Sequence, residues 1–169
     1  MGAETNKLRQ SCPAHFVARW QAGLELQDKR IRNSSDPLHT QIDLDLYVLT
    51  LRNLIRAVEH AENSTDSVEI RKAREDFKKA VPGWLNVRDF VEHFDEYSQG
   101  IGKLQKKGKA IVYGPYYAEE ERYDTSGVLT SKNYYLSFGE GNQVDILTTT
   151  REACKLATIT LDVCNIMQN

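Results

Sequence analysis

One short stretch of the chain carries residue types that can do acid–base chemistry on a phosphate, namely Arg88, Asp89 and His93. Asp89 and His93 are four positions apart, so on a helix they share one face and the carboxylate can orient the imidazole, which then moves protons near neutral pH. Arg88 has a planar fork of donors that suits a phosphate, although Glu92 competes for it. The stretch therefore indicates phosphate chemistry or, alternatively, only the solvated face of an amphipathic helix with two i,i+4 ion pairs.

Other common catalytic and metal-binding patterns are absent from the sequence. There is no GxGxxG or GxxxxGK[ST] loop for phosphates, no GxSxG nucleophile and no HExxH metal motif. His60 and His93 each follow a glutamate directly, whereas a di-iron bundle needs the spacing Glu-x-x-His. Adjacent residues of a helix point about 100° apart and cannot chelate one ion. We therefore expect no metal or other cofactor.

Hydrophobic residues recur at helical spacing in four segments of the first part of the chain. The expected helices span His15 to about Arg32, Leu38 to about Ala61, a charged segment from Ser67 to Pro82-Gly83, and a segment from Trp84 to Gly100. Pro37 suits the first turn of the second helix, and Ser67 is a good N-cap for the third. The second helix is apolar nearly all round, which predicts that it is the central, most buried one. The fourth helix positions Arg88 and His93.

After Gly102 the pattern changes to short runs of β-branched and aromatic residues. The expected strands are Ala110–Val112, Tyr134–Phe138 and Gln143–Leu147, with a hairpin turn at Gly139–Asn142. Thr148 or Thr149 can cap a final helix. The sequence thus predicts a single, mainly α domain over residues 1–169. It consists of a four- or five-helix bundle (about 14–102 and 148–167) with a β-hairpin region (about 110–147) inserted before the C-terminal helix.

Composition and charge narrow the class of protein. The chain has 169 residues, enough for one domain with a substantial core, and its formal net charge of -2 excludes a strongly basic nucleic-acid binder of the histone type. Its three cysteines form no CxxC pair, which argues against a disulfide framework and a four-thiolate zinc site. No apolar run approaches the ~18 residues of a membrane helix, and the polar N-terminus lacks a secretory signal. We therefore expect no membrane association and a cytoplasmic location.

The order Arg88, Asp89, three further residues and His93 resembles the signature of the HEPN superfamily, a class of small, all-helical, mostly prokaryotic domains. In that signature an arginine is followed by a polar residue and, within a few positions, by a histidine. The signature lies on a late helix of a four- or five-helix bundle. The resemblance covers about Phe16 to Gly102 and the last helix, whereas the β-hairpin region departs from it.

The resemblance implies a homodimer in which the signature helices of two chains face each other across a shared cleft. Catalytic members are metal-independent RNA endonucleases, so the chain is expected to cleave RNA, with a toxin or defence role and a cognate antitoxin or regulator protein as a further partner. His93 would move protons between the ribose 2′-hydroxyl and the leaving 5′-oxygen, Arg88 would steady the charge on the phosphorane, and Asp89 would orient one of them. Some family toxins carry a tyrosine two residues after the histidine, where this chain has Asp95; its nearest tyrosine is Tyr97.

A basic run and a set of aromatic residues complete the expected sites. The basic run either holds the RNA backbone or is a solvated loop, and it comprises Lys103, Lys106, Lys107 and Lys109. The aromatic set is expected at the dimer interface and comprises Trp84, Phe90, Phe94 and Tyr97. Such contacts need no chemistry. The alternative function is therefore a non-catalytic HEPN-like helical dimer that serves as a protein- or nucleotide-binding scaffold.

Overall fold

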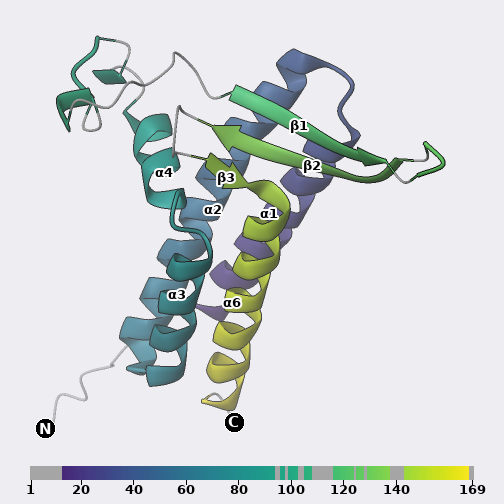
Figure 1. The fold of residues 1–169 in the computed structure, drawn as a ribbon. Helices are drawn as coiled ribbons and strands as arrows, with labels where there is room; N and C mark the ends of the chain where they lie inside the picture. Colours follow the sequence, from purple (N-terminus) through teal and green to yellow (C-terminus); the bar gives the residue numbers. More distant parts are fainter. Residues whose placement is uncertain are drawn as a thin grey trace, which may run out of the picture.

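The chain folds mainly into helices, with a small antiparallel sheet before the last of them (Figure 1). The computed structural model describes residues 13–93, 96–97, 99–102, 105–107, 116–123, 125–127, 129–137 and 143–167. Its elements are α1 (Ala14–Asn33), α2 (Pro37–Thr65), α3 (Val68–Ala80), α4 (Trp84–Glu92), the short 3-10 helix η1 (Gln105–Lys107), β1 (Tyr116–Tyr123), β2 (Leu129–Ser137), β3 (Gln143–Asp145) and α6 (Ile146–Ile166). The predicted mainly α fold with a β element before the C-terminal helix is confirmed.

The helical core is organised around α6, which packs against α1, α2 and α3. In Figure 1 these helices run side by side, and the sheet lies across one end of the bundle, where α6 begins. The largest fully buried side chains include Leu24, Tyr47, Leu54, Ile70 and Leu156. They come from α1, α2, α3 and α6, so each of these helices contributes an apolar face to one core. Within the described residues, no helix has the length and apolar character that crossing a bilayer requires.

The ends of α2 follow from local hydrogen bonds. Asp36 caps its start, because Oδ1 accepts from the backbone N–H groups of Leu38 at 2.8 Å and His39 at 3.1 Å. The helix continues to Thr65, beyond its predicted end near Ala61. It ends at Asp66, whose φ of 49° lies in the left-handed region. The predicted cap of α3 is confirmed, since Ser67 Oγ accepts from Ile70 N at 3.3 Å.

Burial along α2 differs between its two halves. From Leu51 onward its apolar residues are largely buried, as predicted. In the first half, however, an apolar stripe remains on the surface, which corrects the expectation that this helix is buried nearly all round. The stripe consists of Leu38 (67% exposed), Ile42 (47%), Leu46 (39%) and Leu49 (39%), and we refer to it as the α2 stripe. An exposed apolar row of this kind is typical of a contact surface.

The sheet has the order β1-β2-β3, with both pairs antiparallel. The predicted pairing of the last two strands is confirmed, because Leu136 of β2 lies opposite Val144 of β3. The turn 139–142 and the expected strand 110–112 lie outside the described residues. β1 was not predicted, because three successive glutamates at 119–121 are poor strand formers. Its backbone register places Glu121 opposite Lys132.

The junction of α4, β3 and α6 depends on close backbone approach. A Cβ atom at Gly83, just before α4, would lie 2.7 Å from the carbonyl oxygen of Gln143, so only glycine allows α4 to begin this close to β3. Asp145 ends β3 and caps α6, because its Oδ1 accepts from Thr148 N at 2.7 Å. The prediction that Thr148 or Thr149 caps this helix was therefore wrong. Asp145 lies three positions before Thr148 N, which is the cap geometry that a carboxylate fills well.

Candidate functional site

The residues with predicted acid–base chemistry lie at the C-terminal end of α4. Arg88 and Asp89 are half-buried within this helix. The helix ends at Glu92 instead of continuing to Gly100, so His93 is its C-cap, with φ −122° and ψ 35°. The His93 side chain is 49% exposed, and its Nδ1 lies 3.6 Å from Oε1 of Glu96. The imidazole is therefore accessible, and a carboxylate lies beside it.

Asp89 has a different partner from the one expected. Its Oδ2 accepts a hydrogen bond of 3.0 Å from Oη of Tyr97. The helical spacing that would bring Asp89 and His93 together ends at Glu92, and only the backbone N–H of His93 still bonds to the Asp89 carbonyl, at 3.1 Å. Asp89 thus holds the segment after α4, and Glu96 takes the place beside the imidazole.

Tyr97 is a core residue that anchors the turns after α4. It is only 3% exposed, and its carbonyl accepts from Gln105 Nε2 at 3.1 Å. Gln105 Oε1 in turn accepts from Gly102 N at 2.9 Å. A side chain at Gly102 would collide with the Tyr97 ring, so the glycine is needed for this packing. These contacts connect Asp89 to the start of η1.

Two of the four expected dimer-interface residues have almost no exposed surface within a single chain. Trp84 and Tyr97 are each 3% exposed within a single chain and belong to its core. Side chains buried in this way offer little surface to a second chain, and their expected role as dimer contacts stays a prediction. Phe94 lies outside the described residues, and Phe90 is described only through its backbone in α4.

The expected RNA-binding lysines are described only in part. Lys106 is exposed in η1, directly beyond the turns anchored by Tyr97. Lys107 is described through its backbone in the same short helix, and Lys103 and Lys109 lie outside the described residues. The interpretation of this run as an RNA contact stays a prediction.

A basic groove brings Arg88 together with cationic residues of two other helices. The groove has a volume of about 220 Å³ and lies among α2, α3 and α4. Its lining comprises Arg52, Ile55, Arg56 and Glu59 of α2, Arg74, Phe77 and Lys78 of α3, and Trp84, Leu85 and Arg88 of α4. Five of these side chains are cationic and only Glu59 is acidic. We call this the basic groove.

Carboxylates fix one side of the basic groove. Arg74 is held by Glu59 at 3.2 Å and by Glu62 at 2.8 Å, and Glu62 also accepts from Arg71 at 3.0 Å. Burial alone would raise the pKa of Glu62, but the hydrogen bonds and positive charge of Arg71 and Arg74 outweigh it, and its pKa lies below the ordinary value. The Glu62 carboxylate therefore stays charged and keeps the Arg74 guanidinium in place.

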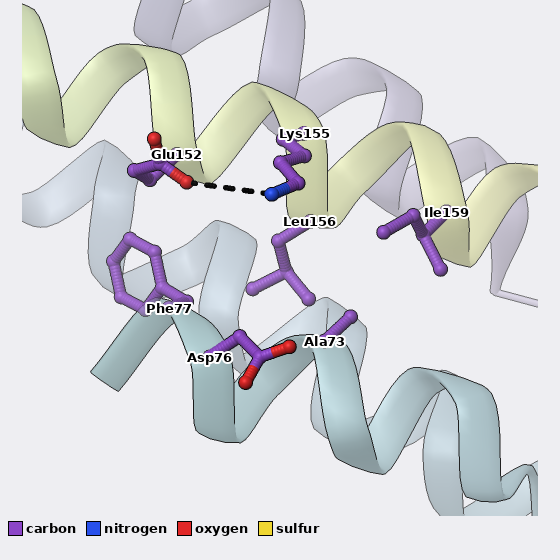
Figure 2. A pocket seen from close by; sticks show the side chains of 7 residues that line it. All are labelled: Ala73, Asp76, Phe77, Glu152, Lys155, Leu156 and Ile159. Atoms are coloured by element: carbon purple, nitrogen blue, oxygen red, sulfur yellow. Dashed lines mark ion pairs between the residues drawn. The ribbon is translucent and has the colours of Figure 1, made fainter. Parts of the chain in front are cut away.

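A second hollow, between α3 and α6, is too small to bind a ligand. Figure 2 shows Phe77 and Leu156 facing each other between the two helices, with the Glu152–Lys155 ion pair at its rim. Its volume of about 30 Å³ has room for about one or two water molecules. Oε2 of Glu152 and Nζ of Lys155 are 3.9 Å apart, and both residues belong to α6, so this ion pair does not connect the two helices.

Metal binding finds no support in the described part of the chain, which holds no group of three or more His, Cys, Asp or Glu side chains arranged around a common point. Comparisons with protein-family models, with curated protein sequences and with solved structures gave no match. The candidate site is therefore assessed from its own geometry.

Sequence reasoning missed most of the basic groove. Its cations come from three helices, and only Arg88 was identified beforehand. A signal was nevertheless present: Arg52 and Arg56 are four positions apart, and so are Arg74 and Lys78. This spacing places each pair on one face of its helix. What the spacing does not reveal is that the two faces border the same groove.

Proposed function

We propose that the chain is a metal-independent, HEPN-type endoribonuclease, in which Arg88 binds the scissile phosphate and His93 transfers protons. One observation carries the proposal: the same end of α4 presents Arg88 to a cation-lined groove and leaves His93 accessible five positions later. A guanidinium for the phosphate and an accessible imidazole are the two groups that RNA cleavage through the 2′-hydroxyl requires.

The reaction is an internal displacement at phosphorus. The ribose 2′-oxygen loses its proton to an imidazole and forms a bond to phosphorus, and the bond from phosphorus to the 5′-oxygen breaks. The leaving 5′-oxygen takes a proton, so the products are a 2′,3′-cyclic phosphate and a 5′-hydroxyl, without a metal or a redox step. Oε1 of Glu96 lies 3.6 Å from Nδ1 of His93, and the other ring nitrogen, Nε2, is the one proposed to transfer protons.

Two chains would supply two imidazoles, one to accept and one to donate a proton. Trp84 and Tyr97 are buried within one chain and offer the proposed homodimer little surface. The α2 stripe is an apolar surface of the kind that homodimers cover. The same stripe favours the second candidate function, a non-catalytic scaffold that binds another protein.

The decisive experiment compares RNA cleavage by the unaltered protein and by His93→Ala, in the presence of a chelator. The expected result is a loss of about a hundredfold or more in His93→Ala, because general acid–base catalysis contributes about this much. His60→Ala is the matched control, since His60 is exposed on α2 and follows the same Val-Glu dipeptide as His93. Cleavage at the same rate by His93→Ala would overturn the catalytic assignment. Absence of cleavage by the unaltered protein would favour the scaffold.

A further inference from the structure

The cations of the basic groove form two rows on facing helices. Arg52 and Arg56 are one turn apart on α2, and Arg74 and Lys78 are one turn apart on α3. Residues four apart on a helix are separated by about 6 Å along its axis. The groove therefore presents positive charge at two successive levels, with Arg88 of α4 as a fifth cation.

The positive charge of the basic groove is local. The whole chain has a formal net charge of -2, yet the lining has five cations and one carboxylate. Two carboxylates outside the lining also pair with it, Glu62 with Arg74 at 2.8 Å and Glu75 with Lys78 at 2.8 Å. Within the lining itself, five cations stand against one carboxylate. Such an excess in a concave site concentrates the field and attracts anions.

One cation of the groove is held in place by ion pairs, and part of the lining is apolar. Arg74 is only 19% exposed at its side chain, and its Nε and Nη1 are held by Glu62 and Glu59, so little conformational freedom is lost when its Nη2 group meets an anion. Phe77 and Trp84, exposed by 2% and 3%, also line the groove. An apolar lining of this kind keeps water away from part of the bound group and strengthens its charged hydrogen bonds.

We propose that the basic groove binds two neighbouring phosphate groups of one ligand. Arginine forks match phosphate oxygens in pairs, and the two levels of cations match two phosphates in succession. The volume of about 220 Å³ suits phosphate groups with the rest of the ligand outside the groove. Neighbouring phosphates occur in free oligophosphates, such as a nucleoside diphosphate, and along a nucleic-acid strand. The proposal does not rest on RNA cleavage by His93.

Isothermal titration calorimetry on the full chain tests this binding with three probes: inorganic tripolyphosphate, ADP and a six-residue oligodeoxythymidylate. The oligodeoxynucleotide lacks the 2′-hydroxyl, so the proposed cleavage chemistry cannot act on it. Trp84 offers a second readout, because it lines the groove and is one of only two tryptophans in the chain. Trp20→Phe leaves Trp84 as the sole indole, whose fluorescence then reports on the groove.

The test variant is Arg56→Ala/Lys78→Ala, which removes one cation from each row. Its matched control is Arg151→Ala/Lys79→Ala, which makes the same change of charge outside the groove; Lys79 is the next residue of α3 and pairs with Asp76 as Lys78 pairs with Glu75. Circular dichroism checks that both variants keep their helices. We expect the test variant to bind at least about tenfold more weakly, and the control to change by less than about twofold.

The three probes also distinguish the two sources of phosphate. Similar affinity for tripolyphosphate and ADP, with weaker binding of the oligonucleotide, assigns the groove to a free oligophosphate. Tighter binding of the oligonucleotide, displaced by tripolyphosphate, assigns it to a strand. Absence of binding by all three probes in both readouts overturns the proposal, as does binding that both double variants retain equally. His93→Ala is expected to bind like the unaltered protein, so a failure of the nuclease proposal leaves this result intact.

Discussion

Tyr97 Oη donates a hydrogen bond of 3.0 Å to Asp89 Oδ2, and this bond ties the segment after α4 back onto the helix. The tyrosine ring is buried and the carboxylate is half-buried, so the bond forms where water competes poorly. The pairing gives Asp89 a structural role: it sets the position of the turns that leave the candidate site.

We expect Tyr97→Phe to lower the free energy of unfolding by about 1–2 kcal/mol, because it removes one charge-assisted hydrogen bond and keeps the ring. Urea denaturation measures this change. Asp89→Asn keeps an oxygen that can accept the bond and should cost less. In the double variant the two effects should not add, because both act on the same bond. Fully additive losses would contradict the proposed coupling.

The buried carboxylate of Glu62 should make stability depend on pH. Its pKa in the folded chain lies below the ordinary value of 4.5, so the unfolded chain binds the proton more readily. The stabilisation is therefore present above about pH 4.5 and is lost as the pH falls through the folded-state pKa. Glu62→Gln should be less stable at pH 7 by about 1–3 kcal/mol and should lose less on acidification.

Thermal unfolding between pH 7 and pH 3 checks this dependence. Glu75→Gln is a suitable comparison, because Glu75 pairs with Lys78 on the exposed side of α3 and its pKa is lowered by the same kind of hydrogen bond. An exposed pair is screened by solvent, so its removal should change stability less. Parallel pH profiles for the unaltered protein and Glu62→Gln would refute the role given to Glu62.

The cap of α6 provides a third prediction. Asp145→Ala should reduce stability by about 1 kcal/mol, because the N–H of Thr148 loses its acceptor. Thr148→Ala should have little effect, since the backbone of Thr148, and not its side chain, makes the capping bond. Chemical denaturation of both variants distinguishes the two residues, and a larger loss in Thr148→Ala would show that the helix is capped differently.

The sequence was sufficient to predict the elements whose signals are local. The helical periodicity, together with Pro37 in the first turn of α2 and the Ser67 cap of α3, located these two helices, because helices form between residues that are close in the chain. The early end of α4 was not predictable in this way. No glycine or proline lies between Trp84 and Gln99 to signal the end of the helix. The residues after Glu92 are instead positioned by the hydrogen bond from Tyr97 to Asp89.

The candidate site was predicted only where one helix suffices. Arg88 and His93 could be identified from their spacing, whereas the basic groove depends on how α2, α3 and α4 pack together. The burial of Trp84 in the core of its own chain could not be predicted for the same reason. An aromatic residue on an amphipathic helix can face its own core or a partner, and spacing alone does not distinguish the two.

The position of α6 in the bundle has a consequence for how the chain folds during synthesis. The last helix, α6, packs against α1, α2 and α3, although it begins at Ile146, far beyond the end of α3 at Ala80. Until α6 has left the ribosome, the apolar residues of the earlier helices that pack against α6 remain exposed. The bundle is therefore expected to reach its native packing only after translation of α6, and nascent chains that stop before Ile146 should be substrates for chaperones and proteases.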